Sequence, residues 1–170
     1  MKYLIGFSIL IFVIASGFLV WQKRPETSEE VHIHAGFVIV KDGIKQDFSS
    51  VKYMHVKPCT TDDGEEVRLT SEEEQLEKGH LHDRVGDIIH IHRKGTLWRD
   101  LFTNINYPVD ESIQGFINGE SVENILDKEI SAYDSAVFVV GGTQIDLSEM
   151  VKQAVTKDYI KEIESHGESC

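Results

Sequence analysis

Residues 31–40 read VHIHAGFVIV, a run of β-branched and aromatic residues that predicts a strand. The dipeptide Asp42-Gly43 follows, and between apolar runs it predicts a hairpin that returns through Ile44–Phe48. The strand also carries His32 and His34, whose side chains share one face because residues i and i+2 of a strand point the same way. This stretch therefore organises the expected sheet and presents a pair of imidazoles on it.

The rest of residues 31–146 predicts a single small histidine-rich domain of β-hairpins around a helix. Strands are expected at Asp87–Arg93 and Ala136–Val140, and a second hairpin at Phe116–Glu120. Helices are expected from the Thr70 capping box to Gly79, over Leu97–Ile105 after a Thr96 cap, and at the C-terminus over residues 147–166. The pattern predicts an α+β fold, of which a β-grasp-like roll is one candidate form, with the C-terminal helix packed on the domain or extending it.

The N-terminal segment differs in character from this domain. Tyr3–Trp21 holds no charged residue, and as a helix it would reach about 28 Å, close to the roughly 30 Å hydrocarbon core of a bilayer. We expect a transmembrane anchor over residues 1–24 and a linker over residues 25–30; Ala15-Ser16-Gly17 keeps a cleaved signal peptide open as the alternative. The short N-terminus favours a single-pass protein of the cell membrane, with membrane contact through residues 3–21 and an extracytoplasmic C-terminal domain.

Charge and cysteine content exclude several function classes. The chain has 17 Lys and Arg against 29 Asp and Glu, so no basic excess exists to neutralise phosphates, and we expect no nucleic-acid partner. Without the three basic residues of segment 1–24, 14 basic residues face 29 acidic ones, a net charge of −15. Two cysteines, Cys59 and Cys170, cannot build a disulfide scaffold or a four-thiolate zinc site, and whether they pair is left open.

The histidines point to a function. Six of the eight occur in three His-x-His pairs, namely His32/His34, His80/His82 and His90/His92. Neutral imidazole is a ligand for zinc and copper, and each strand pair offers two such ligands side by side. If the chain turns about Gly86, His82 faces His90 and His80 faces His92. The pattern predicts a metal site of these four, with His32 and His34 completing it or forming a second site.

Three further residues near these pairs allow more than one interpretation. Asp83 directly follows His82 and is a metal ligand, a carboxylate that orients an imidazole, or a turn residue. His55, with Met54 and Cys59 nearby, would suit copper, but in an expected loop it is more often incidental. His166 ends the last helix, where the helix dipole favours a cation.

Established catalytic motifs are absent from the chain. It has no His-x-His-x-Asp-His, no His-Glu-x-x-His, no cupin pattern and no Cys-x-x-Cys. We assign no catalytic residue and expect a metal-binding domain for zinc or copper. The alternatives are a metal-dependent hydrolase or oxidoreductase that uses the same histidines, and a non-catalytic module that binds an unknown protein partner in a membrane assembly.

The motif set as a whole resembles a group of small, uncharacterised, membrane-anchored prokaryotic proteins. The resemblance rests on the anchor, on His-x-His-Ala-x-Phe at His32–Phe37, on His-Leu-His-Asp at His80–Asp83, and on Ile-His-Ile-His within Gly86–His92. Members are sometimes labelled disulfide-isomerase proteins, which implies a thiol-redox setting. This chain departs from that label because it lacks Cys-x-x-Cys.

Overall fold

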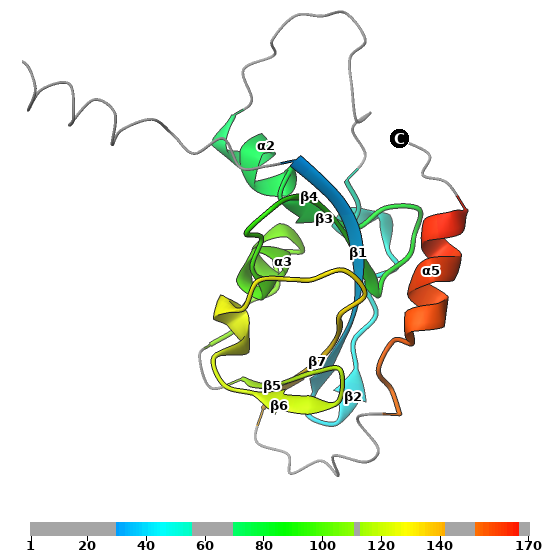
Figure 1. Ribbon diagram of the computed structural model, residues 1–170. Helices are drawn as coiled ribbons and strands as arrows, with labels where there is room; N and C mark the ends of the chain where they lie inside the picture. Colours follow the sequence, from blue (N-terminus) through cyan, green and yellow to red (C-terminus); the bar gives the residue numbers. More distant parts are fainter. Residues whose placement is uncertain (1–29, 56–69, 111–112, 142–151, 167–170) are drawn as a thin grey trace, which may run out of the picture.

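A computed structural model of the protein describes residues 30–55, 70–110, 113–141 and 152–166 (Figure 1). The strands are β1 Glu30–Lys41, β2 Ile44–Lys45, β3 Gly79–His80, β4 Ile88–Arg93, β5 Gln114–Ile117, β6 Glu120–Val122 and β7 Ser135–Val140. The helices are α2 Ser71–Leu76, α3 Trp98–Asn104 and α5 Lys157–Ser165, with 3₁₀ turns η1 Val51–Tyr53 and η2 Ile125–Asp127. The predicted α+β class is confirmed; the β-grasp-like form stays a prediction.

One mixed sheet of seven strands forms the centre of the fold. Its order is β3-β4-β1-β7-β5-β6, and β2 pairs with β1. β1 runs parallel to β7 on one side and antiparallel to β4 on the other. Residues 31–40 thus belong to a central strand that is hydrogen-bonded along both edges.

The alternation of side chains along β1 divides the sheet into two faces. Ala35, Phe37 and Ile39 point into the larger core, where they pack with Trp98 and other residues of α3. Val38 and Val40 point to the opposite face and pack against α5. In Figure 1, α3 and α5 accordingly lie on opposite sides of β1. His32 and His34 belong to the α5 face, because they keep the even-numbered phase of Val38 and Val40.

Close packing against Val155 explains why residue 36, on the α5 face between His34 and Val38, is a glycine. A Cβ at Gly36 would lie 2.5 Å from the Cβ of Val155, so only glycine lets the segment before α5 pack against β1. Val155 and Ile160 are both buried there. The C-terminal helix is therefore seated directly beside the histidines of β1.

Both predicted hairpins and the first predicted helix are confirmed. Asp42 and Gly43 have φ of 50° and 81°, which suits the tight turn between β1 and β2. Asn118 and Gly119 repeat this conformation between β5 and β6. In α2 the side chain of Thr70 accepts from the Glu73 backbone and the Glu73 side chain accepts in return, as the capping box predicts.

Two helix starts differ from the sequence prediction. α3 has Leu97 as its N-cap rather than Thr96, since the Asp100 carboxylate accepts from the Leu97 N–H at 2.9 Å. Thr96 instead donates to the carbonyls of Arg93 and Lys78. α5 begins only at Lys157, and Lys152–Thr156 precede it without helical conformation.

Other predictions fall on parts of the chain that the structure leaves out. The expected anchor over Tyr3–Trp21, Cys59, Cys170 and residues 142–151 lie outside the described residues. Within residues 30–55, 70–110, 113–141 and 152–166, the helices are too short or too polar to cross a bilayer.

Candidate metal centre

Three histidines form a row across neighbouring strands. His90 of β4 lies opposite His80 of β3 on one side and opposite His34 of β1 on the other. The ring centroid of His90 is 5.5 Å from that of His80 and 4.6 Å from that of His34. His90 is 0% exposed, so the middle of the row is closed to solvent.

A β-bulge brings His32 and His92 beside this row. The register between β1 and β4 shifts by one residue near the start of β1, so that Val31 and His32 together oppose the single residue His92. The His32 ring lies 4.4 Å from His90, and the His92 ring lies 4.2 Å from His90. His92 is also 5.0 Å from His80. Bulges of this kind redirect side chains, and here four rings, those of His32, His34, His80 and His92, lie around the buried imidazole of His90.

Two more rings join the cluster on the β3 side. His82 lies 5.1 Å from His90, and His55 lies 4.7 Å from His80. His55 is held there because its backbone N–H donates to the carbonyl of Leu81 at 2.8 Å. The sequence predicts a loop around His55, where such a residue is more often incidental than a copper ligand, whereas in the fold it extends the cluster. We call these seven rings the histidine cluster: His32, His34, His55, His80, His82, His90 and His92.

The cross-strand pairing predicted for the second and third His-x-His motifs is wrong: the register differs from the prediction by two residues. His80, not His82, lies opposite His90. The chain turns at Asp83 and Arg84, both with positive φ, where the Val85 N–H donates to the His82 carbonyl. A shift of two residues keeps every side chain on its face, so the four histidines still share one side of the sheet.

Two groups of three nitrogen ligands are close enough to hold a metal ion. One is His32, His34 and His90, and the other is His80, His90 and His92; in each, the ligand atoms lie within 4.8 Å of one another. His90 belongs to both groups. We call them the β1-side triad and the β3-side triad, after the strands that contribute His34 and His80.

Burial keeps two of these rings, those of His80 and His90, in the neutral form that coordinates metals. Burial, and to a smaller extent the nearby rings of His55 and His92, lower the pKa of His80 from its ordinary 6.5 to about 4. The pKa of His90 is also held far below its ordinary value, first by burial and then by the adjacent rings of His92 and His34. At neutral pH both rings therefore carry an uncharged lone pair for a cation.

The Nδ1 atoms of three cluster histidines face oxygen acceptors. Nδ1 of His82 lies 2.8 Å from Oδ2 of Asp83, and Nδ1 of His80 lies 3.3 Å from the Leu76 carbonyl. Nδ1 of His34 lies 3.5 Å from Oε1 of Glu164. For His80 and His82 the oxygen acceptor favours the proton on Nδ1, which leaves the lone pair on Nε2. Metal-binding histidines are oriented in this way.

Asp83 combines two of the roles that the sequence left open. Its carboxylate contacts the His82 ring, and its φ of 54° makes it one of the two left-handed residues of the turn. Asp83 is not a member of either triad. It orients an imidazole from a turn position.

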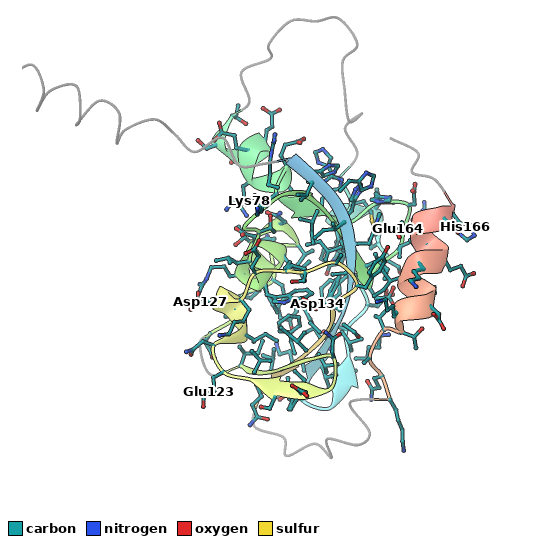
Figure 2. The ribbon with its side chains drawn as sticks, viewed as in Figure 1. Lys78, Glu123, Asp127, Asp134, Glu164 and His166 are labelled. Carbon is teal, nitrogen blue, oxygen red and sulfur yellow. The ribbon has the colours of Figure 1, made fainter. Side chains whose placement is uncertain are left out.

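Glu164 is the functional candidate that sequence reasoning missed. It lies on the side of α5 that faces the sheet, whereas His166 lies at the end of the helix (Figure 2). The Tyr133 hydroxyl donates to Oε2 of Glu164 at 2.8 Å, and the Tyr133 backbone N–H donates to the His34 carbonyl at 2.8 Å. One residue thus fixes both His34 and its carboxylate neighbour. The spacing of four from the buried Ile160 was the available signal, since it places Glu164 on the inner face of the helix.

His166 stays apart from the histidine cluster. It is exposed and caps the C-terminus of α5, in agreement with the position expected for it. It is therefore a natural control for the cluster.

Comparison with protein-family models, with curated proteins and with solved structures finds no match to this chain. Its function is therefore inferred from the geometry of the histidine cluster.

Proposed function

We propose that the protein binds a divalent transition metal ion, zinc or copper, through the histidine cluster, on a membrane-anchored domain outside the cytoplasm. The observation that carries the proposal is the pair of ligand triads centred on the buried ring of His90. Burial of the polar rings of His34, His80 and His90 costs free energy of desolvation, so such a cluster has little value for stability by itself. Coordination of a metal ion by these nitrogens would offset that cost.

The donor set suits zinc and copper better than harder ions. All ligands in both triads are nitrogen atoms, whereas Ca²⁺ and Mg²⁺ take oxygen ligands. The net charge of −15 calculated for the chain beyond residue 24 adds a general attraction for cations. The uncharged run Tyr3–Trp21 supports the anchored, extracytoplasmic setting.

The test is metal retention by the full chain, purified without a histidine tag in mild detergent. After loading with Zn²⁺ or Cu²⁺ and desalting against a weak chelator, we expect at least one ion per chain by elemental analysis. Replacement His90→Gln keeps a polar side chain in place but removes the ring shared by both triads, and it should abolish retention. The matched control His166→Gln changes a histidine outside the cluster and should retain metal as the parent does.

Circular dichroism and melting temperature show whether His90→Gln still folds. A parent chain that retains neither ion, or a folded His90→Gln chain that retains as much as the parent, would overturn the proposal. Metal should also raise the melting temperature of the parent, because an ion that binds only the folded state stabilises it by mass action.

A metal-dependent enzyme is the second candidate, favoured by the number of ligands in each triad. Three protein ligands leave a fourth tetrahedral position for water or substrate, as in catalytic zinc sites. A cavity of about 220 Å³ lies beside the β3-side triad, lined in part by His55 and His80. This is smaller than the roughly 300–1,000 Å³ of typical ligand pockets. Zinc-dependent hydrolysis of an activated ester that is lost in His90→Gln would favour the enzyme.

A further inference from the structure

The histidine cluster contains more rings than one ion can use. A tetrahedral zinc site takes four ligands, whereas seven imidazoles are in contact here. The rings beyond the four that one ion uses are arranged on both sides of His90. His32 and His34 come from β1, on one side of His90, while His80 comes from β3 on the other side. The cluster is therefore two-sided, with His90 in the middle.

The strand order places His90 between the two sets of ligands. Because β4 lies between β3 and β1 in the sheet, the row runs His80, His90, His34. The β1-side triad has two rings of its own, and the β3-side triad also has two rings of its own. Neither triad depends on the other for any ligand except His90.

Imidazole can serve two ions at once through its two nitrogens. A neutral ring has one lone pair, but a ring that has lost its N–H proton has two, which point away from opposite sides of the ring. Two metal–nitrogen bonds of about 2.0–2.1 Å and the width of the ring would separate the ions by about 6 Å. Cations on both sides stabilise the deprotonated ring, just as a metal deprotonates other ligands that it binds.

We propose that the histidine cluster is a two-metal site, with one ion in the β1-side triad, one in the β3-side triad, and His90 as an imidazolate bridge between them. This rests on the proposed metal binding. On loading, His90 releases its ring proton to solvent and gives one nitrogen lone pair to each ion; neither ion changes oxidation state. His32 and His34 complete one ion's protein ligands, and His80 and His92 complete the other's.

Titration of the metal-free full chain with Cu²⁺ tests the bridge, because bridged copper ions couple magnetically. We expect two copper ions per chain by elemental analysis. The first equivalent should give the full electron paramagnetic resonance intensity for one copper. The second should reduce the intensity per copper, since an imidazolate bridge couples the two unpaired spins antiferromagnetically.

Variants that remove one side separate the two ions. His34→Gln should leave one copper per chain with full spin intensity, held by the β3-side triad, and His80→Gln should leave one held by the β1-side triad. His166→Gln should match the parent. Circular dichroism of each variant shows that the sheet is intact.

The outcomes distinguish this inference from the proposal on which it rests. A parent chain that binds only one copper, or two with undiminished spin intensity, overturns the bridge and leaves metal binding in place. A parent chain that binds no copper and no zinc overturns both. Two coupled ions in the parent, reduced to one uncoupled ion in His34→Gln and in His80→Gln, is the result that the structure predicts.

Discussion

Acid should destabilise the metal-free protein through its buried histidines. The pKa of His80 is about 4 in the folded chain against an ordinary 6.5, and that of His90 is lowered as well. Between these values the unfolded chain binds a proton that the folded chain does not, so stability falls as the pH drops from 6.5 towards 4. By this linkage His80 alone contributes a loss of about 2 kcal/mol between pH 7.5 and pH 5.

His90 acts in the same direction, so the loss of stability at pH 5 should exceed that from His80 alone. Domains of this size have about 5–15 kcal/mol of net stability, which makes the effect large. The groups that face His80 do not offset the loss. After burial, the rings of His55, His92 and His82 lower its pKa, and the opposite effect of the Leu76 carbonyl is smaller than that of burial. The ring of His90 also faces it. The carboxylate of Asp100 does not add to the loss at pH 5, because burial raises its pKa but hydrogen bonds from Lys78 and Gln75 outweigh this and lower it.

The assay is denaturant unfolding of the chelator-treated full chain, followed by the fluorescence of the buried Trp98, at pH 7.5 and pH 5. We expect a lower midpoint at pH 5 with an unchanged slope. The double variant His80→Gln/His90→Gln should lose most of the difference between the two pH values, and His166→Gln should keep it. Equal or greater stability of the parent at pH 5, or an undiminished difference in the double variant, would refute the reasoning.

Three further predictions concern the supports of the cluster and the anchor. In a calorimetric titration with metal, Glu164→Gln should weaken metal binding to the β1-side triad by about 10–100-fold, as loss of a carboxylate that orients a metal-binding histidine usually does. Glu162→Gln, on the exposed face of α5, should have no effect in that titration. Asp100→Ala should lower the free energy of unfolding by about 2–3 kcal/mol in denaturant, because the Asp100 carboxylate caps α3 and accepts from Lys78 at 2.7 Å. Asp127→Ala, which removes the exposed partner of Arg99, should lower it by under about 1 kcal/mol. The full chain should sediment with membranes, and a chain that begins at Pro25 should not; recovery of the intact full chain in the soluble fraction would exclude the anchor over Tyr3–Trp21.

Local sequence signals predicted local structure well. Asp42-Gly43 and Asn118-Gly119 form the tight turns that their left-handed conformations allow, and Thr70 caps α2. The parity rule correctly placed His32 and His34 on one face, because alternation depends only on the strand itself.

The failures arise where distant segments decide the geometry. The sequence predicts Gly86 as a turn residue. In the fold, a Cβ there would lie 2.4 Å from the Ser49 backbone, so a glycine is required because the two segments pack closely. The turn lies at Asp83 and Arg84 instead, which moves the histidine pairing by two residues. A single sequence carries no sign of that approach.

The size of the cluster also depends on long-range contacts. His34 meets His90 because β1 lies beside β4, and strand order cannot be read from local patterns. His55 joins through a contact with Leu81, and Glu164 reaches His34 from a helix 130 residues later in the chain. The sequence therefore predicted that histidines gather on one face and named six of the seven rings of the histidine cluster, but not their pairing or the residues that support them.

X-ray absorption of the zinc-loaded full chain tests the central claim most directly, because it reports the atoms bound to the metal. The histidine cluster predicts zinc–nitrogen distances of about 2.0–2.1 Å with the outer-shell scattering of imidazole rings. A shell of sulfur atoms at about 2.3 Å, or of light atoms without imidazole scattering, would contradict it.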